Sequence, residues 1–293
     1  MNSRIVKSNN SPLNEEPEAE PPGQHASSII AINKSNEAFL KRNNIPISFQ
    51  SRVFIEKYFP AITETEWNDW QWQLRNSYSS FQQLSTFLNL SENEVKPSFD
   101  NQQMPVRITP YYASLLDPFN SSQALRKTMV PVYNELNVSD IEKSDPLSEE
   151  ELSPVPHLVH RYPDRVLFLV TGFCAAYCRY CTRSHMVSRK DKCHSNRSDW
   201  DVALDYIRAH REVRDVLLSG GDPLTLPDHR LEYLLSNLRS IPHVEIIRIG
   251  TKVPVVLPQR ITKGLVNMLK KYHPLFISIH FTHPDEITPE VGF

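Results

Sequence analysis

Cysteine is scarce in this chain, and the few cysteines are not spread along it. The 293 residues include four cysteines, of which three fall between positions 174 and 181. A disulfide framework would distribute paired cysteines along the sequence, so this clustering argues against one. Clustered cysteines instead favour metal ligation in a reducing compartment.

Long apolar runs and an excess of charge of one sign are also missing. No run approaches the roughly 20 apolar residues that a membrane helix needs. The N-terminus lacks the basic-then-apolar layout of a secretory signal. The formal charge of -2 excludes the strong positive field typical of nucleic-acid-binding proteins. We therefore expect a cytoplasmic protein with no membrane partner and no nucleic-acid partner.

Composition divides the chain into three parts. Residues 1–45 are rich in Ser, Asn, Glu and Pro and are expected to form a disordered polar tail. Residues 46–156 show helical patterns and an acidic, proline-bearing linker, with Thr63 and Thr65 as candidate N-caps. Residues 157–293 alternate between strand-like and helix-like patterns, and five of the seven glycines lie between positions 172 and 264. Tight turns and close ligand approach are therefore expected in this third part.

Short β-rich runs in the third part are separated by helical patterns that begin after Ser198, Asp228 and Thr262. The predicted strands are Val166–Val170, Asp215–Leu218, Glu245–Ile249 and Leu275–Ile279. Repeated βα units imply a parallel sheet with right-handed crossovers, as a barrel or an open doubly wound sheet. In both architectures the ligand site lies at the carboxyl ends of the strands.

The three clustered cysteines directly follow the first predicted strand. Cys174, Cys178 and Cys181 have the spacing C-x3-C-x2-C. Three thiolates can hold three irons of a four-iron cluster and leave the fourth iron open to a cofactor. The competing interpretation is a zinc site with His185 or Cys193 as the fourth ligand. The unequal spacing and the strand-end position favour the cluster, and Cys193 is then a free thiol.

Two further motifs suit ligand binding. Ser219, Gly220, Gly221 and Asp222 end the second predicted strand, where glycines let a ligand approach the backbone N–H groups. A plain strand-to-helix turn would explain the same residues. Arginines also flank the cysteines, and arginine grips phosphate or carboxylate bidentately. A solvated basic face or an RNA-binding rim is the alternative.

Together these motifs resemble the radical S-adenosylmethionine (SAM) superfamily. The longer strings HRYPDRVLFLVT, CRYCTR, LLSGGDPL and RIGTKVPVVLPQRIT are similar to lysine 2,3-aminomutase and its close relatives. The resemblance covers roughly residues 63–291. It implies an α/β fold, namely a partial (βα) barrel of radical SAM type with a helical N-terminal region. It also implies an isomerase that moves an amino group from C2 to C3 via a 5′-deoxyadenosyl radical.

The resemblance to this family also implies roles for individual residues of this chain. The implied ligands of a [4Fe–4S] cluster are Cys174, Cys178 and Cys181. The implied SAM contacts are Tyr180 at the adenine, Ser219, Gly220, Gly221 and Asp222 at the methionine part, and His280. The implied contacts of pyridoxal 5′-phosphate (PLP) are Arg161, Tyr162 and Arg165, while Arg183 would bind the substrate's α-carboxylate. Implied partners are an amino acid, a reductant such as flavodoxin or ferredoxin, and a second copy in a homo-oligomer.

The chain also departs from the family pattern. It shows four βα strands where the family's barrel has six, and no stretch matches the glycine-rich segment with the PLP lysine. Lys252 and Lys263 are poor substitutes. We therefore expect a C-terminally truncated barrel that exposes an edge strand and apolar surface and is unstable or inactive alone. The alternatives are a PLP-free radical SAM enzyme acting on a protein or RNA, and a non-enzymatic cluster-binding protein. Lysine is the default substrate.

Overall fold

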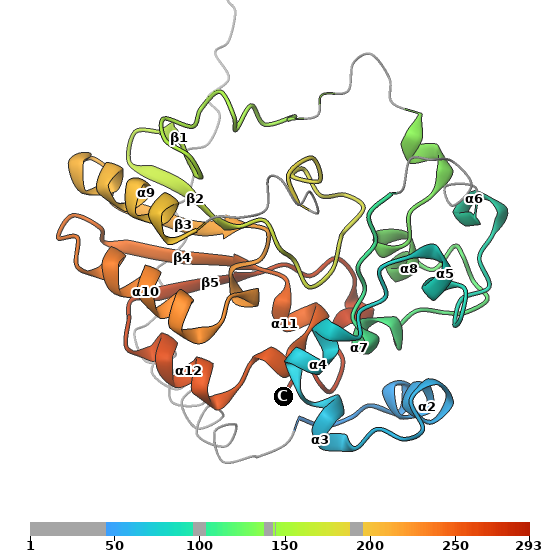
Figure 1. Ribbon diagram of the computed structural model, residues 1–293. Helices are drawn as coiled ribbons and strands as arrows, with labels where there is room; N and C mark the ends of the chain where they lie inside the picture. Colours follow the sequence, from blue (N-terminus) through green and yellow to red (C-terminus); the bar gives the residue numbers. More distant parts are fainter. Residues whose placement is uncertain (1–44, 96–103, 138–142, 144, 188–195) are drawn as a thin grey trace, which may run out of the picture. The chain divides into compact units, whose positions relative to one another are not determined.

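A computed structural model describes residues 45–95, 104–137, 143, 145–187 and 196–293 (Figure 1). Their central feature is a five-stranded sheet with the strand order β1-β2-β3-β4-β5. The strands are β1 (Leu158–Tyr162), β2 (Arg165–Thr171), β3 (Asp215–Gly220), β4 (Ile246–Thr251) and β5 (Leu275–Ile279). β1 pairs antiparallel with β2, and the remaining neighbours pair in parallel. This confirms the predicted α/β class and all four predicted strands.

β1 is the one strand that the sequence pattern did not predict. Pro163 and Asp164 join it to β2, and Tyr162 pairs directly with Arg165 across this short turn. Only the first two residues of β1 are buried, so the strand carries little apolar signal. Because β1 lies at the edge of the sheet and carries charged side chains, the hydrophobic pattern of the sequence did not predict it.

Three helices cover one face of the sheet: α9 (Arg197–Ala209), α10 (Asp228–Arg239) and α12 (Lys263–Lys270) (Figure 1). Thr262 caps α12 as predicted, but the cap of α9 is Asn196 and not Ser198. The Asn196 side chain accepts the backbone N–H of Asp199, which places the helix start earlier. The buried stripe of α9 includes Trp200, whose indole N–H donates to the carbonyl of Val170.

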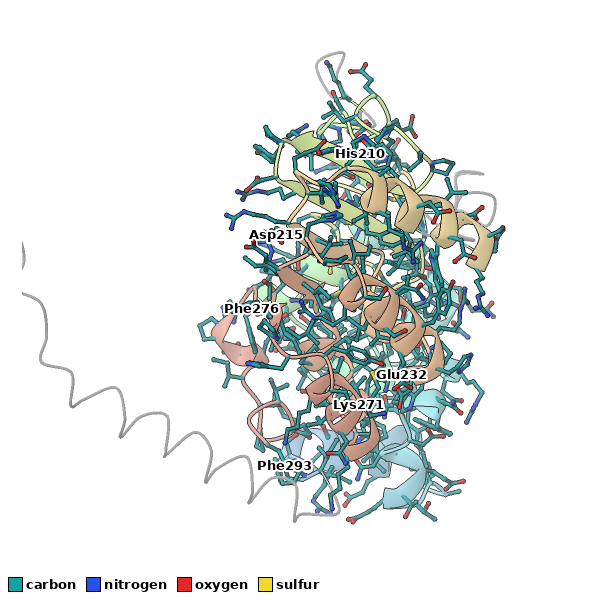
Figure 2. The ribbon with its side chains drawn as sticks, turned by 90° about the vertical axis from the view of Figure 1, so that its left-hand side faces the viewer. His210, Asp215, Glu232, Lys271, Phe276 and Phe293 are labelled. Atoms are coloured by element: carbon teal, nitrogen blue, oxygen red, sulfur yellow. The ribbon has the colours of Figure 1, made fainter. Side chains whose placement is uncertain are left out.

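The opposite face of the sheet, which we call the open face, carries different residues. Val166, Phe168 and Val170 of β2 are almost fully buried in the core that includes the helices. Because side chains alternate along a strand, Arg165 and Thr171 lie on the open face. Figure 2 shows Asp215 and Phe276 on the side of the sheet away from the helices that carry Glu232 and Lys271.

The N-terminal region consists of short helices, as expected. They are α2 (Phe49–Tyr58), α3 (Glu64–Trp67), α4 (Trp70–Arg75), α5 (Phe81–Leu84), α6 (Glu92–Val95), α7 (Pro110–Ala113), α8 (Ala124–Met129) and the 3-10 helix η2 (Tyr133–Leu136). Thr63 forms a capping box at α3. The Thr109 hydroxyl, which caps α7, donates to the carbonyl of Val256 beyond β4, at 2.6 Å. This contact joins the region to the carboxyl ends of the strands. The predicted tail lies almost entirely outside the described residues, and the domain boundaries stay predictions.

β5 is an edge strand within the described part of the chain. It pairs with β4, and its side chains are exposed on both faces: Phe276 is 54% exposed, Ile277 43% and Ile279 45%. Among the described helices, none has the length and apolar character to cross a membrane.

Candidate functional site

The loop after β2 carries the three cysteines and is fixed by its backbone. The N–H of Tyr177 donates to the carbonyl of Arg107 at 3.0 Å, and the N–H of Arg179 donates to the carbonyl of Thr128 at 2.8 Å. The Arg179 guanidinium is also gripped by both oxygens of Glu135. The N-terminal helical region therefore holds the cysteine loop in place from one side.

A cavity of about 410 Å³ lies at the carboxyl ends of the strands. This volume is within the usual range for a small-molecule site. Its lining residues come from the ends of β2, β3, β4 and β5: Cys174, Ala175, Ala176, Cys178, Tyr180, Cys181, Thr182, Arg183, Gly220, Gly221, Asp222, Gly250, Thr251, Lys252, Val256, Ser278 and His280. The cavity thus gathers nine of the thirteen residues that the sequence singled out.

The three thiols lie on one loop at the cavity. A four-iron cluster can use such a set, because each thiolate binds a different iron and the fourth iron stays open. Of the two candidates for a fourth zinc ligand, His185 is not among the cavity-lining residues and Cys193 lies outside the described residues. The choice of cluster over zinc therefore stays a prediction from the sequence.

Burial raises the pKa of the Cys178 thiol, while a hydrogen bond with Tyr180 and the ammonium of Lys252 act in the opposite direction. The thiol must lose its proton to become a ligand, so iron binding and deprotonation are coupled here. Lys252 also contributes positive charge beside a site that becomes negative when thiolates form.

The two adjacent glycines are required by close packing. Gly220 has a φ of +113°, and a Cβ there would lie 2.4 Å from the carbonyl oxygen of Thr171. A Cβ on Gly221 would lie 2.3 Å from the carbonyl oxygen of Phe173. The end of β3 therefore packs directly against the start of the cysteine loop, and any side chain would separate them.

Asp222 is a buried carboxylate with protein donors around it. It accepts the Thr251 hydroxyl at 2.6 Å and the backbone N–H groups of Leu224, Lys252 and Val253 at 3.1, 2.7 and 3.0 Å. Burial raises its pKa against the opposing effect of these donors. Asp222 thereby ties the end of β3 to the end of β4 and fixes the cavity floor.

Tyr180 and His280 face each other across the cavity. Their rings meet edge to face with centroids 5.5 Å apart. Burial and the nearby Lys252 lower the pKa of His280, so its imidazole is neutral near pH 7. The two nearly perpendicular rings form an uncharged aromatic corner of the cavity, where a base can stack on one ring and meet the edge of the other.

A buried network beneath the cavity was missed by sequence reasoning. Glu286, which is fully buried, accepts the Lys252 ammonium at 2.7 Å and the Tyr112 hydroxyl at 2.8 Å. Lys252 also donates to the Thr282 hydroxyl at 3.2 Å. Burial opposes ionisation of Glu286, but its hydrogen bonds and the Lys252 charge outweigh burial and lower its pKa. The sequence offered one indication of this network: Lys252 directly follows β4, at the strand ends where the cavity lies.

Arg183 lies at the cavity with one edge of its guanidinium already held. Its Nε and Nη2 donate to Glu149 at 2.8 and 2.7 Å. Such a bidentate pair fixes the plane of the guanidinium and leaves its other N–H groups available to a carboxylate.

Arg161, Tyr162 and Arg165 lie elsewhere. Arg165 starts β2, about 20 Å along the strand from Thr171 at its carboxyl end. The Arg165 guanidinium stacks over the Tyr162 ring at 5.6 Å, and Arg161 donates to the carbonyl of Leu147. None of the three lines the cavity. Ser219 also does not line it, although its position on β3 is adjacent.

Comparison with known proteins agrees with this geometry. The Radical SAM superfamily model matches residues 168–292. A protein named L-lysine 2,3-aminomutase from Fusobacterium nucleatum is 49% identical over 236 residues, which are 80% of this chain and 55% of that protein. A glutamate 2,3-aminomutase from Clostridioides difficile is 42% identical over 229 residues, or 78% of this chain and 54% of its own length.

An L-lysine 2,3-aminomutase from Haemophilus influenzae is 35% identical over 237 residues, which are 78% of this chain and 67% of that protein. The chain spans about half the length of most of the curated relatives that it matches. The superfamily match includes all the residues that line the cavity, together with β3, β4 and β5.

Proposed function

Because this chain belongs to the lysine 2,3-aminomutase family of radical SAM enzymes, we propose that it acts in the 2,3-aminomutase reaction, with free lysine as the substrate. The proposal is carried by one observation: the three thiols, the paired glycines and the Tyr180–His280 pair line a single cavity. Lysine is the default because the relatives at 48–49% identity carry the name L-lysine 2,3-aminomutase. Identity alone does not rank the substrates, since the glutamate enzyme is 42% identical and the lysine enzyme of Haemophilus influenzae 35%.

When bound, the cluster would supply the electron that cleaves SAM, and PLP would carry the amino group during its move from C2 to C3. Cys174, Cys178 and Cys181 would hold the cluster on one wall of the cavity. Gly220 and Gly221 line the cavity and would contact the methionine part of SAM, and their lack of side chains keeps the end of β3 packed against the cysteine loop. The carboxylate of Asp222 acts from beneath, by fixing the strand ends.

The remaining proposed contacts concern the ring systems and the substrate. Tyr180 and His280 would contact the adenine, which suits their edge-to-face arrangement. The free edge of the Arg183 guanidinium would take the α-carboxylate of the amino acid. Arg161, Tyr162 and Arg165 would hold the PLP phosphate from the far end of the open face, where Arg165 and Tyr162 already stack. A reductant such as flavodoxin or ferredoxin would deliver the electron, in the cytoplasm.

The test is turnover by anaerobically reconstituted protein supplied with SAM, PLP, a strong reductant and isotopically labelled lysine. We expect β-lysine with the label in the product, measured by mass spectrometry, and we expect its formation to need both SAM and PLP. Deoxyadenosine release that needs no PLP and gives no β-amino acid would contradict an aminomutase and indicate another radical SAM reaction.

A further inference from the structure

A charged pair lies on the open face, in the middle of the sheet. Arg248 of β4 donates from Nε to Asp215 of β3 at 2.9 Å, and its Nη2 lies 2.8 Å from the other carboxylate oxygen in an ion pair. The Asp215 side chain is 11% exposed and the Arg248 side chain 32% exposed. Figure 2 shows Asp215 on the side of the sheet away from the helices. The pair is therefore half-sheltered and accessible from that side.

Fold stability alone gives no reason for this pair. Strands of parallel sheets are usually apolar on both faces, and Ile247 and Ile249 on the other face of β4 follow that rule. Replacing a sheltered ion pair by packed apolar residues is often neutral or stabilising. Stability therefore does not account for Arg248, and a ligand contact is the function we consider for it.

The register places this pair beside the residues already proposed for PLP. Arg165 is the direct partner of Asp215, and Tyr162 is the direct partner of Arg165, so all three share the open face. Arg248 pairs with Leu217, two residues further along. From strand spacing and rise, the Cα atoms of Arg165 and Arg248 are about 12 Å apart. Two long cationic side chains therefore flank one stretch of the open face.

The guanidinium of Arg248 is oriented and still has donors to offer. Asp215 occupies its Nε–Nη2 edge, and within the described residues Nη1 makes no hydrogen bond. The second hydrogen of Nη2 and both hydrogens of Nη1 form a fork that matches a phosphate. Asp164 holds Arg165 in a similar way, with Nε and Nη2 donating at 3.0 and 3.4 Å. Each arginine is therefore fixed by a carboxylate and keeps Nη1 for an anion.

We propose that Arg248 binds the phosphate group of PLP together with Arg165, and that Asp215 positions the Arg248 guanidinium for this contact. This inference rests on the proposed function, which supplies PLP as the ligand. Arg248 touches the cofactor, while Asp215 acts through Arg248 as a positioning residue.

The test uses pyridoxine 5′-phosphate, which has no aldehyde and so cannot react with surface lysines. Binding to the full chain is followed by ligand fluorescence, with pyridoxine, which lacks the phosphate, as the matched ligand. Losing a charge-assisted contact made by two N–H groups weakens binding by about tenfold or more. Arg248→Met should therefore bind pyridoxine 5′-phosphate at least tenfold more weakly than the wild-type chain, with pyridoxine binding unchanged.

Three variants act as controls. Arg248→Lys keeps the charge without the fork and should have an intermediate affinity. The double variant Asp215→Asn/Arg248→Met leaves no unpaired carboxylate, and it should be as weak as Arg248→Met. Arg208→Met removes an exposed arginine of α9 that pairs with Asp205, and it should bind like the wild-type chain.

The outcomes separate this inference from the proposed function. Equal affinity of Arg248→Met and wild type, in a chain that prefers pyridoxine 5′-phosphate to pyridoxine, overturns the role of Arg248 alone. No phosphate preference in the wild-type chain overturns both this inference and the PLP part of the proposed function. Inorganic phosphate that binds as tightly as pyridoxine 5′-phosphate would show a general anion site and contradict a cofactor site.

Discussion

The two ends of the open face are built in different ways. At the carboxyl ends of the strands, the cavity is shaped by backbone: glycines in contact with carbonyl groups, and Asp222 holding three N–H groups. Toward the amino ends, the surface is shaped by long side chains from separate strands, such as Arg165 and Arg248. A site shaped by close backbone contacts tolerates almost no substitution. At a site made of long side chains, each substitution is expected to weaken ligand binding by a limited amount.

The sharpest test of this difference is Gly221→Ala. The added Cβ would lie 2.3 Å from the carbonyl oxygen of Phe173, so β3 and the cysteine loop must separate. We expect complete loss of SAM binding by the reconstituted protein in equilibrium dialysis. Pyridoxine 5′-phosphate binding at the other end should persist, which also serves as the folding control. Normal SAM affinity in this variant would contradict the close packing.

The next largest effect is expected at the buried Lys252–Glu286 pair beneath the cavity. Glu286→Gln leaves the ammonium without its counter-ion, which typically costs about 3–5 kcal/mol of unfolding free energy. Urea denaturation at pH 7 measures this loss. A loss below 1 kcal/mol would show that the pair contributes little to the cavity floor.

The Lys252–Glu286 pair should also make the stability of the protein depend on pH. Because the pKa of Glu286 is lowered below its ordinary value of 4.5 on folding, its ionised form stabilises the protein above about pH 4.5. That contribution declines as the pH falls through the lowered folded-state pKa. Between pH 7 and pH 3 the wild-type chain should therefore lose more stability than Glu286→Gln. Parallel pH profiles of the two chains would contradict the lowered pKa.

A smaller, graded effect is expected for Arg183→Lys. A lysine side chain at position 183 keeps the positive charge, but its single ammonium cannot bind Glu149 and a substrate carboxylate at the same time. Binding of free lysine, measured by calorimetry with the reconstituted protein and SAM, should weaken about tenfold. Lysinamide, which lacks the carboxylate, should bind both chains equally, and SAM binding should not change. Equal weakening for lysinamide would indicate a general disturbance of the cavity.

The smallest effect is expected for Gly264→Ala, which is the matched control for Gly221→Ala. Gly264 lies in the first turn of α12, and the nearest atoms to a Cβ there are 3.7 Å away. Alanine in a helix is favoured over glycine by up to about 1 kcal/mol. A slight rise in the denaturation midpoint with full SAM binding is therefore the expected result. A destabilised variant would show that glycine is needed at this site for another reason.

This contrast also explains what the sequence could predict. Most of the cavity could be predicted because its residues occur in short contiguous motifs at strand ends, such as the cysteine loop and the Gly220–Gly221 pair. The Thr262 cap and the four parallel strands could be predicted from hydrophobic periodicity, because these features also depend on residues that are close in sequence.

The remainder was not local. Arg248 and Asp215 are 33 positions apart and meet only because the strands pair in register. Tyr112 and Glu286 are 174 positions apart and meet because the N-terminal helices pack against the strand ends. β1 was missed because its burial covers two residues, and the start of α9 was misplaced because Asn196 and Ser198 are both good caps. Such contacts depend on the assembled fold.

The proposed function depends most directly on what the three thiols hold. The decisive measurement is metal analysis and electron paramagnetic resonance of the anaerobically reconstituted chain, followed by addition of SAM and dithionite. We expect about four irons per chain, a reduced-cluster signal that changes when SAM binds, and formation of 5′-deoxyadenosine. Bound zinc in place of iron, or an iron cluster that neither responds to SAM nor cleaves it, would contradict the proposed radical SAM site.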